Sequence, residues 1–318
     1  MSEQAAGRRI PRRWFLGTAG LAATAGAGAY LYSLAPSFWR RYVNEWGREI
    51  RAPRHTPDPR SWPDRGLHAA WLGHATVLLK IDGFTILTDP VLSTYAGIGL
   101  GIVTLGVKRL VAPAMPSRHL PPVDLVLLSH AHMDHFDIPT LRALESPDVS
   151  VITAHKTSDL LRPERYSVVR ELRWDERTRI GPVEVRALEV KHWGARLRND
   201  RWRGYNGYTI EAGRYRLIFA GDTALTPSFA RLRTARPFDL TIMPIGAYNP
   251  YIRNHCSPEQ AWQMGNEAGA EHFIPIHHGT FQLSREPVGE PIERFLTAAA
   301  NHPDRVAIHE IGQTWQVS

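Results

Sequence analysis

A short string rich in histidine, Ser-His-Ala-His-Met-Asp-His at residues 129–135, constrains this chain more than any other feature. It follows residues 123–128, which are apolar except for one aspartate and therefore predict a largely buried strand. Imidazole and carboxylate are the ligands that Zn²⁺ takes in hydrolytic sites. His130 and His132 alternate and so lie on one side of an extended chain, while the last two residues can turn toward a second ion. The string predicts a metal centre at a strand end, rather than a histidine-rich surface loop.

Three later runs that are predicted as strands are each followed by another possible metal ligand. His192 follows the run at 183–190, Asp222 follows the run ending at residue 220, and His277 follows the run at 273–276. Because binding sites in α/β proteins gather at the carboxyl ends of strands, we expect these side chains to meet the first string.

The remaining patterns predict an α/β domain. Asp82-Gly83 separates two apolar runs as a hairpin turn does, and Gly213 does the same further on. Ser257-Pro258-Glu259-Gln260 is typical of a helix start, with Gly269 beyond the end. Further strands are expected at residues 149–153 and 240–245, and further helices at 139–144, with Asp137 as N-cap, and 292–299. Cys256 is the only cysteine, so no intramolecular disulfide can form.

The N-terminus has the pattern of an export signal. Arginines at positions 8, 9, 12 and 13 precede an uncharged run over residues 14–39, and Arg12-Arg13-Trp14-Phe15-Leu16-Gly17 resembles the twin-arginine signal. An uncleaved membrane anchor is the alternative. We therefore expect a signal or anchor at 1–35, a linker or arm at 36–66 and one catalytic domain at 67–318. The protein is expected to be exported and to be periplasmic or membrane-associated.

The distribution of charge argues against a nucleic-acid partner. The formal net charge is +7, but residues 1–54 hold nine arginines and three glutamates. The rest of the chain has 29 basic and 28 acidic residues, so it lacks the basic surface that nucleic acids require.

Taken together, these strings resemble the metallo-β-lactamase superfamily, and in particular its branch of phospholipases D that hydrolyse N-acyl-phosphatidylethanolamine. The resemblance runs from about residue 65 to 281. It is carried by the His-x-His-x-Asp-His string and by the following further strings: Gly73-His74-Ala75-Thr76, Leu87-Thr88-Asp89-Pro90, Leu120-Pro121-Pro122-Val123-Asp124, Phe219-Ala220-Gly221-Asp222-Thr223, Pro244-Ile245-Gly246-Ala247-Tyr248 and Ile276-His277-His278-Gly279-Thr280-Phe281.

The resemblance implies a four-layer αββα metallo-β-lactamase sandwich that holds two Zn²⁺ ions, with iron or manganese as alternative metals. It implies one ion on His130, His132 and His192 and the other on Asp134, His135 and His277, with Asp222 bridging them. It places His277 rather than its neighbour His278 among the ligands. His74 and Asp89 are expected to orient ligands through hydrogen bonds.

The same resemblance implies a binuclear metallo-hydrolase, a phosphodiesterase of phospholipase D type acting on N-acyl-phosphatidylethanolamine-like lipids. A bridging hydroxide would attack phosphorus, Asp134 would orient it or accept its proton, and His255 would steady the phosphate. His255 as an ordinary surface residue is the alternative. A lactone or other acyl hydrolase using the same metals is the second interpretation of the function. The expected partners are a phospholipid or another small molecule, and peripherally a membrane.

Two groups of apolar residues each have two possible interpretations. Residues 91–107 contain no charged residue, and we expect a buried loop or helix there, with a loop that dips into a membrane as the alternative. Aromatic residues flank the ligand-bearing segments and line either the core or an acyl pocket; they are Trp193, Trp202, Tyr205, Tyr248, Tyr251 and Phe281.

Overall fold

The computed structural model describes residues 43–100, 103–197 and 199–318. The export signal or anchor predicted at 1–35, and the start of the arm at 36–66, lie outside the described residues. The chain divides after Arg48 into two units, and the fold described below is that of residues 49–318. In the described part of the chain, no helix combines the length and the apolar character that crossing a bilayer requires.

The first sheet has seven strands in the order β15-β1-β2-β3-β6-β7-β8, mixed in direction. Its strands are β1 (Leu67–Gly73), β2 (Thr76–Ile81), β3 (Phe84–Thr88), β6 (Leu125–Leu127), β7 (Ser150–Ala154), β8 (Val168–Leu172) and β15 (Thr314–Val317). The hairpin predicted around Asp82-Gly83 is confirmed, since both residues have positive φ, +46° and +89°. Those angles match the type I′ turn that follows the twist of paired strands.

The second sheet has six strands in the order β14-β13-β12-β11-β10-β9. They are β9 (Arg177–Ile180), β10 (Val183–Leu188), β11 (Gly207–Ala212), β12 (Tyr215–Phe219), β13 (Phe238–Pro244) and β14 (Ala270–Ile276). The pairs from β9 to β12 are antiparallel, and β12, β13 and β14 are parallel. Parallel strands end at one edge of a sheet, which brings the loops after β12 and β14 together.

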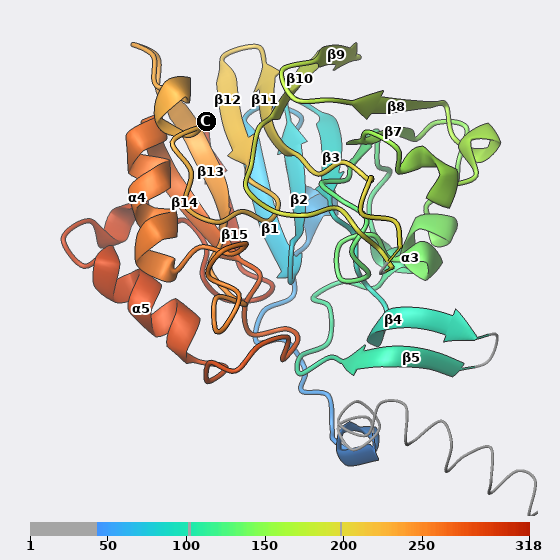
Figure 1. Cartoon of the computed structure of the whole chain (residues 1–318). Helices are drawn as coiled ribbons and strands as arrows, with labels where there is room; N and C mark the ends of the chain where they lie inside the picture. The colour runs from blue at the N-terminus through green and yellow to red at the C-terminus, as the bar shows by residue number, and fades with distance from the viewer. Residues whose placement is uncertain (1–42, 101–102, 198) are drawn as a thin grey trace, which may run out of the picture. The chain divides into compact units, whose positions relative to one another are not determined.

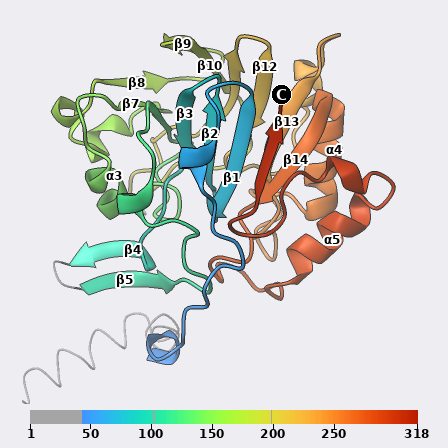
Figure 2. The same cartoon turned by 180° about the vertical axis from the view of Figure 1, so that it is seen from behind.

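The two sheets face each other across one large apolar core, with helices outside them (Figures 1 and 2). Fully buried residues from both sheets, such as Leu79 and Ile210, belong to the same cluster. Helices α4 (Pro258–Ala268) and α5 (Glu290–Ala298) cover the outer face of the second sheet, where Met264 and Phe295 pack in a second cluster. The helix α3 (Ile138–Ala143) packs Leu141 against the main core. This is the expected αββα sandwich, with one helical layer reduced to the short α3 in the described chain.

Short 3₁₀ turns complete the connections; they are η1 (Pro59–Ser61), η2 (Ser117–His119), η3 (Ser158–Leu160), η4 (Pro163–Arg165), η5 (Ala230–Leu232) and η6 (Pro303–Arg305). The predicted start of α4 is confirmed as a capping box. The Ser257 hydroxyl accepts a hydrogen bond from the backbone amide of Gln260, and the Gln260 side-chain oxygen accepts one from the backbone amide of Ser257. Gly269 ends the helix with φ of +81°. Asp137 precedes α3 as predicted, but its side chain binds the hydroxyls of Ser93 and Thr140 instead of capping the backbone.

The apolar run at 91–107 forms a two-stranded hairpin, β4 (Tyr95–Leu100) and β5 (Val103–Lys108), drawn apart from both sheets in Figure 1. The expectation of a buried loop or helix was therefore wrong. Glycines explain the pairing, because a Cβ on Gly97 would lie 2.1 Å from the Leu105 carbonyl oxygen of the facing strand. Ile98 on this hairpin is exposed. An apolar run alone does not distinguish a strand from a buried helix.

Candidate metal centre

The predicted ligands meet at the carboxyl ends of strands from both sheets. His130 lies just beyond β6 in the first sheet, and His192, Asp222 and His277 lie just beyond β10, β12 and β14 in the second. The structure brings all seven predicted ligands together, and their donor atoms fall into sets in which every atom is within 4.8 Å of the others. The first set is His130, His132, His192 and Asp222, and the second is His74, Asp134, His135 and His277. Two smaller sets overlap them, Asp89 with His130 and His135, and Asp222 with His255 and His277.

In the first set, the ring nitrogens converge on one point. Nδ1 of His132 lies 2.8 Å from Nε2 of His130 and 3.2 Å from Nε2 of His192. The Asp222 Oδ2 atom lies 3.7 Å from the same His192 nitrogen. Donors about 2.1 Å from one tetrahedral ion are about 3.4 Å apart, so these separations suit a single Zn²⁺ ion.

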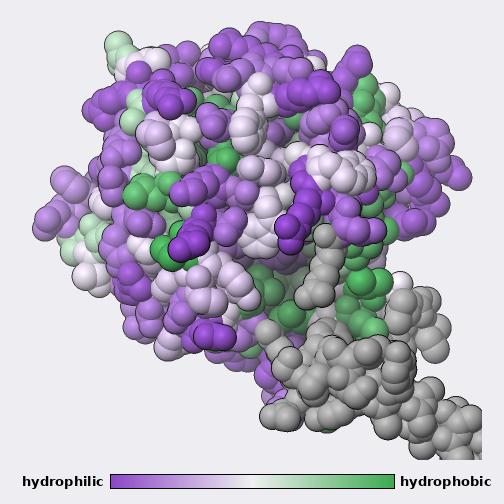
Figure 3. Space-filling view, viewed as in Figure 1, coloured by the Kyte–Doolittle hydropathy of each residue, from purple (hydrophilic) through white to green (hydrophobic). Residues whose placement is uncertain are grey.

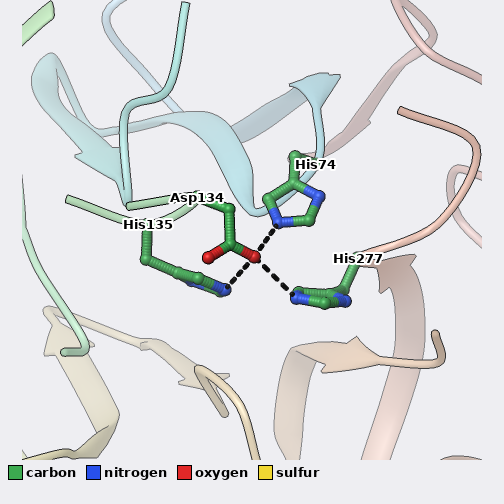
Figure 4. A group of neighbouring side chains, drawn as sticks. All are labelled: His74, Asp134, His135 and His277. Carbon is green, nitrogen blue, oxygen red and sulfur yellow. Dashed lines mark hydrogen bonds and ion pairs between the residues drawn. The ribbon is translucent and has the colours of Figure 1, made fainter. Parts of the chain in front are cut away.

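In the second set, three histidines surround one carboxylate oxygen (Figure 4). Asp134 Oδ2 lies 3.0 Å from Nε2 of His74, 3.4 Å from Nε2 of His277 and 3.6 Å from Nε2 of His135. Asp222 Oδ2 is 3.2 Å from the same nitrogens of His135 and His277, so it stands between the two sets.

The residues fit a pair of metal ions. Three of these buried atoms make no hydrogen bond, namely Nε2 of His135, Nε2 of His277 and Oδ1 of Asp222. Buried polar groups are normally hydrogen-bonded, and buried imidazole nitrogens and carboxylates that lie close together without hydrogen bonds are an arrangement that a cation satisfies.

Hydrogen bonds behind the donor atoms fix the orientation of the rings. Asp89, directly after β3, accepts from Nδ1 of His135 at 2.6 Å and from the Ser129 amide at 2.7 Å. The Ser129 hydroxyl lies 2.8 Å from Nδ1 of His130, and Nδ1 of His192 donates to the Asn254 carbonyl at 2.9 Å. Each contact leaves Nε2 of the ring directed at the cluster. Sequence reasoning found Asp89 but missed Ser129, although it directly precedes the ligand string.

The backbone is strained around the same cluster. His74, Asp89, Ala247 and His277 have φ of +53°, +30°, +63° and +64°, a region that residues other than glycine rarely adopt. Such strain costs about 1–3 kcal/mol per residue and persists where the surroundings enforce it. Gly246 allows the backbones of residues 246 and 277 to pack closely, because a Cβ on Gly246 would lie 2.1 Å from the His277 carbonyl oxygen.

Most side chains of the cluster are in the protonation state that binds a metal ion, that is, a neutral imidazole or a charged carboxylate. Burial lowers the pKa of His192 well below its usual range and that of His132 to about 4, so both are neutral near pH 7. Burial opposes ionisation of Asp222, but nearby histidines outweigh it and hold its pKa well below normal. Burial also opposes the charged form of His277, yet Asp222 and Asp134 raise its pKa to about 9. A cation beside those carboxylates would displace that proton.

The structure separates the two adjacent histidines after β14. His277 is in the cluster, as predicted, whereas His278 packs its ring on Trp71 with 4.6 Å between ring centres. His255 is buried beside the cluster, with Nδ1 3.8 Å from Asp222 Oδ2. Burial lowers its pKa to about 4, so it is neutral near pH 7. The alternative of an ordinary surface histidine at position 255 is therefore wrong.

Apolar side chains are exposed next to the donor atoms. Trp193 is 38% exposed and its ring centre lies 4.5 Å from that of His132. Tyr251 is 47% exposed, 6.4 Å from the ring of His255, and its neighbour Ile252 is also exposed. We call Trp193 and Tyr251 the apolar rim. Among the other predicted aromatics, Trp202 is exposed, Tyr205 is half-buried, and Tyr248 and Phe281 are buried.

On the face drawn in Figure 3, the molecular surface is mostly hydrophilic, with scattered apolar patches. Exposed aromatic side chains therefore lie beside a cluster of buried polar groups, so polar and apolar surfaces adjoin at this point.

Comparisons with known proteins identify relatives of this chain and proteins of the same fold. Residues 85–278 match the family model described as the β-lactamase superfamily domain. An uncharacterized protein of Mycobacterium tuberculosis is 35% identical over 260 residues, covering 78% of this chain and 68% of that one. The N-acyl-phosphatidylethanolamine-hydrolyzing phospholipase D 1 of Caenorhabditis elegans is 27% identical over 277 residues, covering 80% and 77%. The isothiocyanate hydrolase from Delia radicum gut bacteria has a TM-score of 0.63 at 20% identity, covering 79% and 99%, and shares the fold.

Proposed function

The chain belongs to the metallo-β-lactamase superfamily of metal-dependent hydrolases, and we propose that it is a phosphodiesterase of phospholipase D type acting on N-acyl-phosphatidylethanolamine-like lipids. The observation that carries this proposal is the apolar rim beside the donor atoms. A lipid headgroup and its acyl chains need such a pairing of charge and apolar surface. The similarity to the phospholipase of C. elegans over most of both chains supports the same substrate class.

The proposed cofactor is a pair of Zn²⁺ ions, with iron or manganese accepted by the same ligands. His130, His132 and His192 would hold one ion, and Asp134, His135 and His277 the other, with Asp222 between them. Bound there, the ions would supply a hydroxide nucleophile at neutral pH and offset the charge that grows on the phosphoryl oxygens.

The side chains of this chain have separate tasks in the proposed reaction. Asp134 orients the attacking water and accepts its proton, since histidines hold one of its carboxylate oxygens in place. His255, being neutral, donates a hydrogen bond to a phosphoryl oxygen. Water adds to phosphorus, and the bond from phosphorus to the ethanolamine oxygen breaks. The leaving oxygen takes up a proton, giving N-acylethanolamine and phosphatidic acid.

An acyl hydrolase that opens a lactone is the second candidate, and a neutral His255 suits that reaction too. A neutral histidine stabilises an uncharged carbonyl oxygen as well as a phosphoryl oxygen, whereas a phosphate site more often supplies positive charge. The same metal ligands would serve both reactions.

The decisive experiment is metal analysis followed by assay of the zinc-loaded protein on N-acyl-phosphatidylethanolamine, a lactone and a generic phosphodiester. Cleavage of the lipid supports the proposal, and cleavage of the lactone alone refutes it in favour of the second candidate. His132→Ala and Asp222→Ala should each abolish the activity, because each removes a donor atom from the cluster. Activity that survives both changes contradicts the metal centre.

We further propose peripheral contact with a membrane surface and export by the N-terminal segment. Ile98 on the β4–β5 hairpin is 44% exposed and offers an insertion point beside an apolar strand pair. Ile98→Glu should reduce flotation with liposomes, while Leu296→Glu, at a residue of α5 that is 38% exposed, should not. Equal flotation of both variants contradicts the membrane contact.

The export proposal is tested separately, with a reporter fused to residues 1–35. Export of that reporter that continues without the twin-arginine translocase contradicts a twin-arginine signal.

A further inference from the structure

The loop that carries three of the proposed ligands begins and ends at buried carbonyl groups, those of Ala131 and Phe136. Both residues are fully buried. Within the loop, the amides of His135 and Phe136 both donate to the His132 carbonyl, at 3.0 Å and 2.7 Å, so the chain turns tightly. A buried carbonyl requires a hydrogen-bond partner, and a tight loop has few internal donors left for its own ends.

Arg196 provides that partner for both ends of the loop. Its Nη1 atom donates to the Ala131 carbonyl at 3.0 Å and to the Phe136 carbonyl at 2.8 Å. Its guanidinium also lies 5.9 Å from the centre of the Phe136 ring. Arg196 is four residues beyond His192, so one side chain connects the segment of that ligand to both ends of the ligand loop.

The segment that bears Arg196 is itself held in place. A Cβ on Gly194 would lie 2.1 Å from the Arg203 carbonyl oxygen, so the two backbones are in close contact. The amide of Leu197 donates to Asp200 at 2.6 Å, and Arg203 donates to the other oxygen of Asp200 at 2.8 Å. Arg196 therefore extends from a segment of defined geometry and can transmit that geometry to the loop.

We propose that Arg196 is a positioning residue of the metal centre. By binding both carbonyls it sets the span from Ala131 to Phe136, and it thereby holds His132, Asp134 and His135 in register with His192. This inference rests on the metal centre of the proposed function and is independent of the substrate. Its test measures metal binding, so it remains valid whichever molecule the enzyme hydrolyses.

The test compares three variants of the full chain, Arg196→Met, Arg196→Lys and Arg231→Met. Arg231 is the matched control, since its side chain is 70% exposed and its ion pair with Glu189 is a long one of 3.7 Å. The dissociation constant for zinc is measured by competition with a chromophoric chelator, and thermal unfolding of the metal-free proteins is followed in parallel. The kcat and KM values at saturating zinc are recorded for whichever substrate is cleaved.

We expect Arg196→Met to weaken zinc binding by about 10- to 100-fold, the range typical of residues that orient metal ligands. Arg196→Lys should weaken zinc binding less than Arg196→Met does, because an ammonium group can still donate a hydrogen bond to one of the two carbonyls. Arg231→Met should bind zinc like the unaltered protein. At saturating zinc the loss in Arg196→Met should fall on kcat more than on KM, since the contacts of Arg196 are with the ligand loop.

Zinc affinities equal to that of the unaltered protein in both Arg196 variants overturn the inference, even if their melting temperatures fall, because Arg196 then supports folding alone. If Arg196→Met does not fold, Arg196→Lys decides. Weakened zinc binding in that variant supports the positioning role, and unchanged binding refutes it.

Discussion

Asp89→Asn changes one atom at the base of the metal centre and tests how the rings of the cluster are oriented. Asp89 is fully buried and accepts hydrogen bonds from Nδ1 of His135 and from both the amide and the hydroxyl of Ser129. Asparagine keeps the shape but has one acceptor oxygen and one NH₂ group. Whichever way the amide turns, its NH₂ group faces a donor, and either His135 or Ser129 loses its partner.

The magnitude follows from that lost partner. A buried donor left unsatisfied costs about 1–3 kcal/mol. If the cost appears as freedom of His135 to turn its Nε2 away from the cluster, it weakens metal binding by about 5- to 150-fold, since about 1.4 kcal/mol corresponds to a factor of ten. We therefore expect a zinc dissociation constant about 10- to 100-fold higher than that of the unaltered protein.

The assay is zinc titration against a chromophoric chelator, with Asp82→Asn as the matched control. Asp82 also has positive φ and accepts a backbone amide through its side chain, but it is exposed in the turn between β2 and β3. Asp82→Asn should leave zinc affinity unchanged. A folded Asp89→Asn protein with unchanged zinc affinity would refute the reasoning, because His135 would then keep its orientation without the carboxylate.

Three further predictions concern other parts of the chain. Gly246→Ala should weaken zinc binding at least tenfold by displacing His277, whereas Gly99→Ala, where a Cβ meets open space, should not; isothermal titration distinguishes them. Burial opposes ionisation of Glu171, but hydrogen bonds from Ser158, Lys156 and Thr157 lower its pKa to about 2. Glu171 is thus stabilising above about pH 4.5, and the stability lost in Glu171→Gln, measured by urea unfolding, should shrink as the pH falls toward 2. Ser257→Ala should cost about 1 kcal/mol in the same measurement, through loss of the α4 cap.

Local patterns in the sequence were sufficient for much of the fold. The turn at Asp82-Gly83 and the capping box at Ser257 were predicted from neighbouring residues, and the structure confirms both. These features depend on backbone angles and hydrogen bonds within a few residues, so the information is local. The β4–β5 hairpin was missed, because its identity depends on glycines that face each other across two strands.

The metal-ligand cluster, like the fold, was predicted in its local features and not in its long-range contacts. The ligand types and their place after strands were evident from the chain, but the contacts of Ser129, Arg196 and the Asn254 carbonyl were not. Every residue has a backbone carbonyl, so the sequence does not show which carbonyl accepts a hydrogen bond from a ligand. Nor does it distinguish Arg196, which binds Ala131 at a separation of 65 residues, from the other arginines. The apolar rim was likewise identified only when the exposure of each aromatic residue was known.

The sequence by itself determined the types and order of the candidate metal ligands, that is, histidines and aspartates that follow predicted strands in the order of a known superfamily. Only the tertiary structure decided that these donors form sets whose members lie within 4.8 Å of one another. The physical reason is that His135 and His277, which share one set, follow strands of different sheets, and their distance depends on the packing of the core between those sheets. Strand order, strained φ angles and long-range hydrogen bonds are consequences of that packing, and no spacing in the chain contains them.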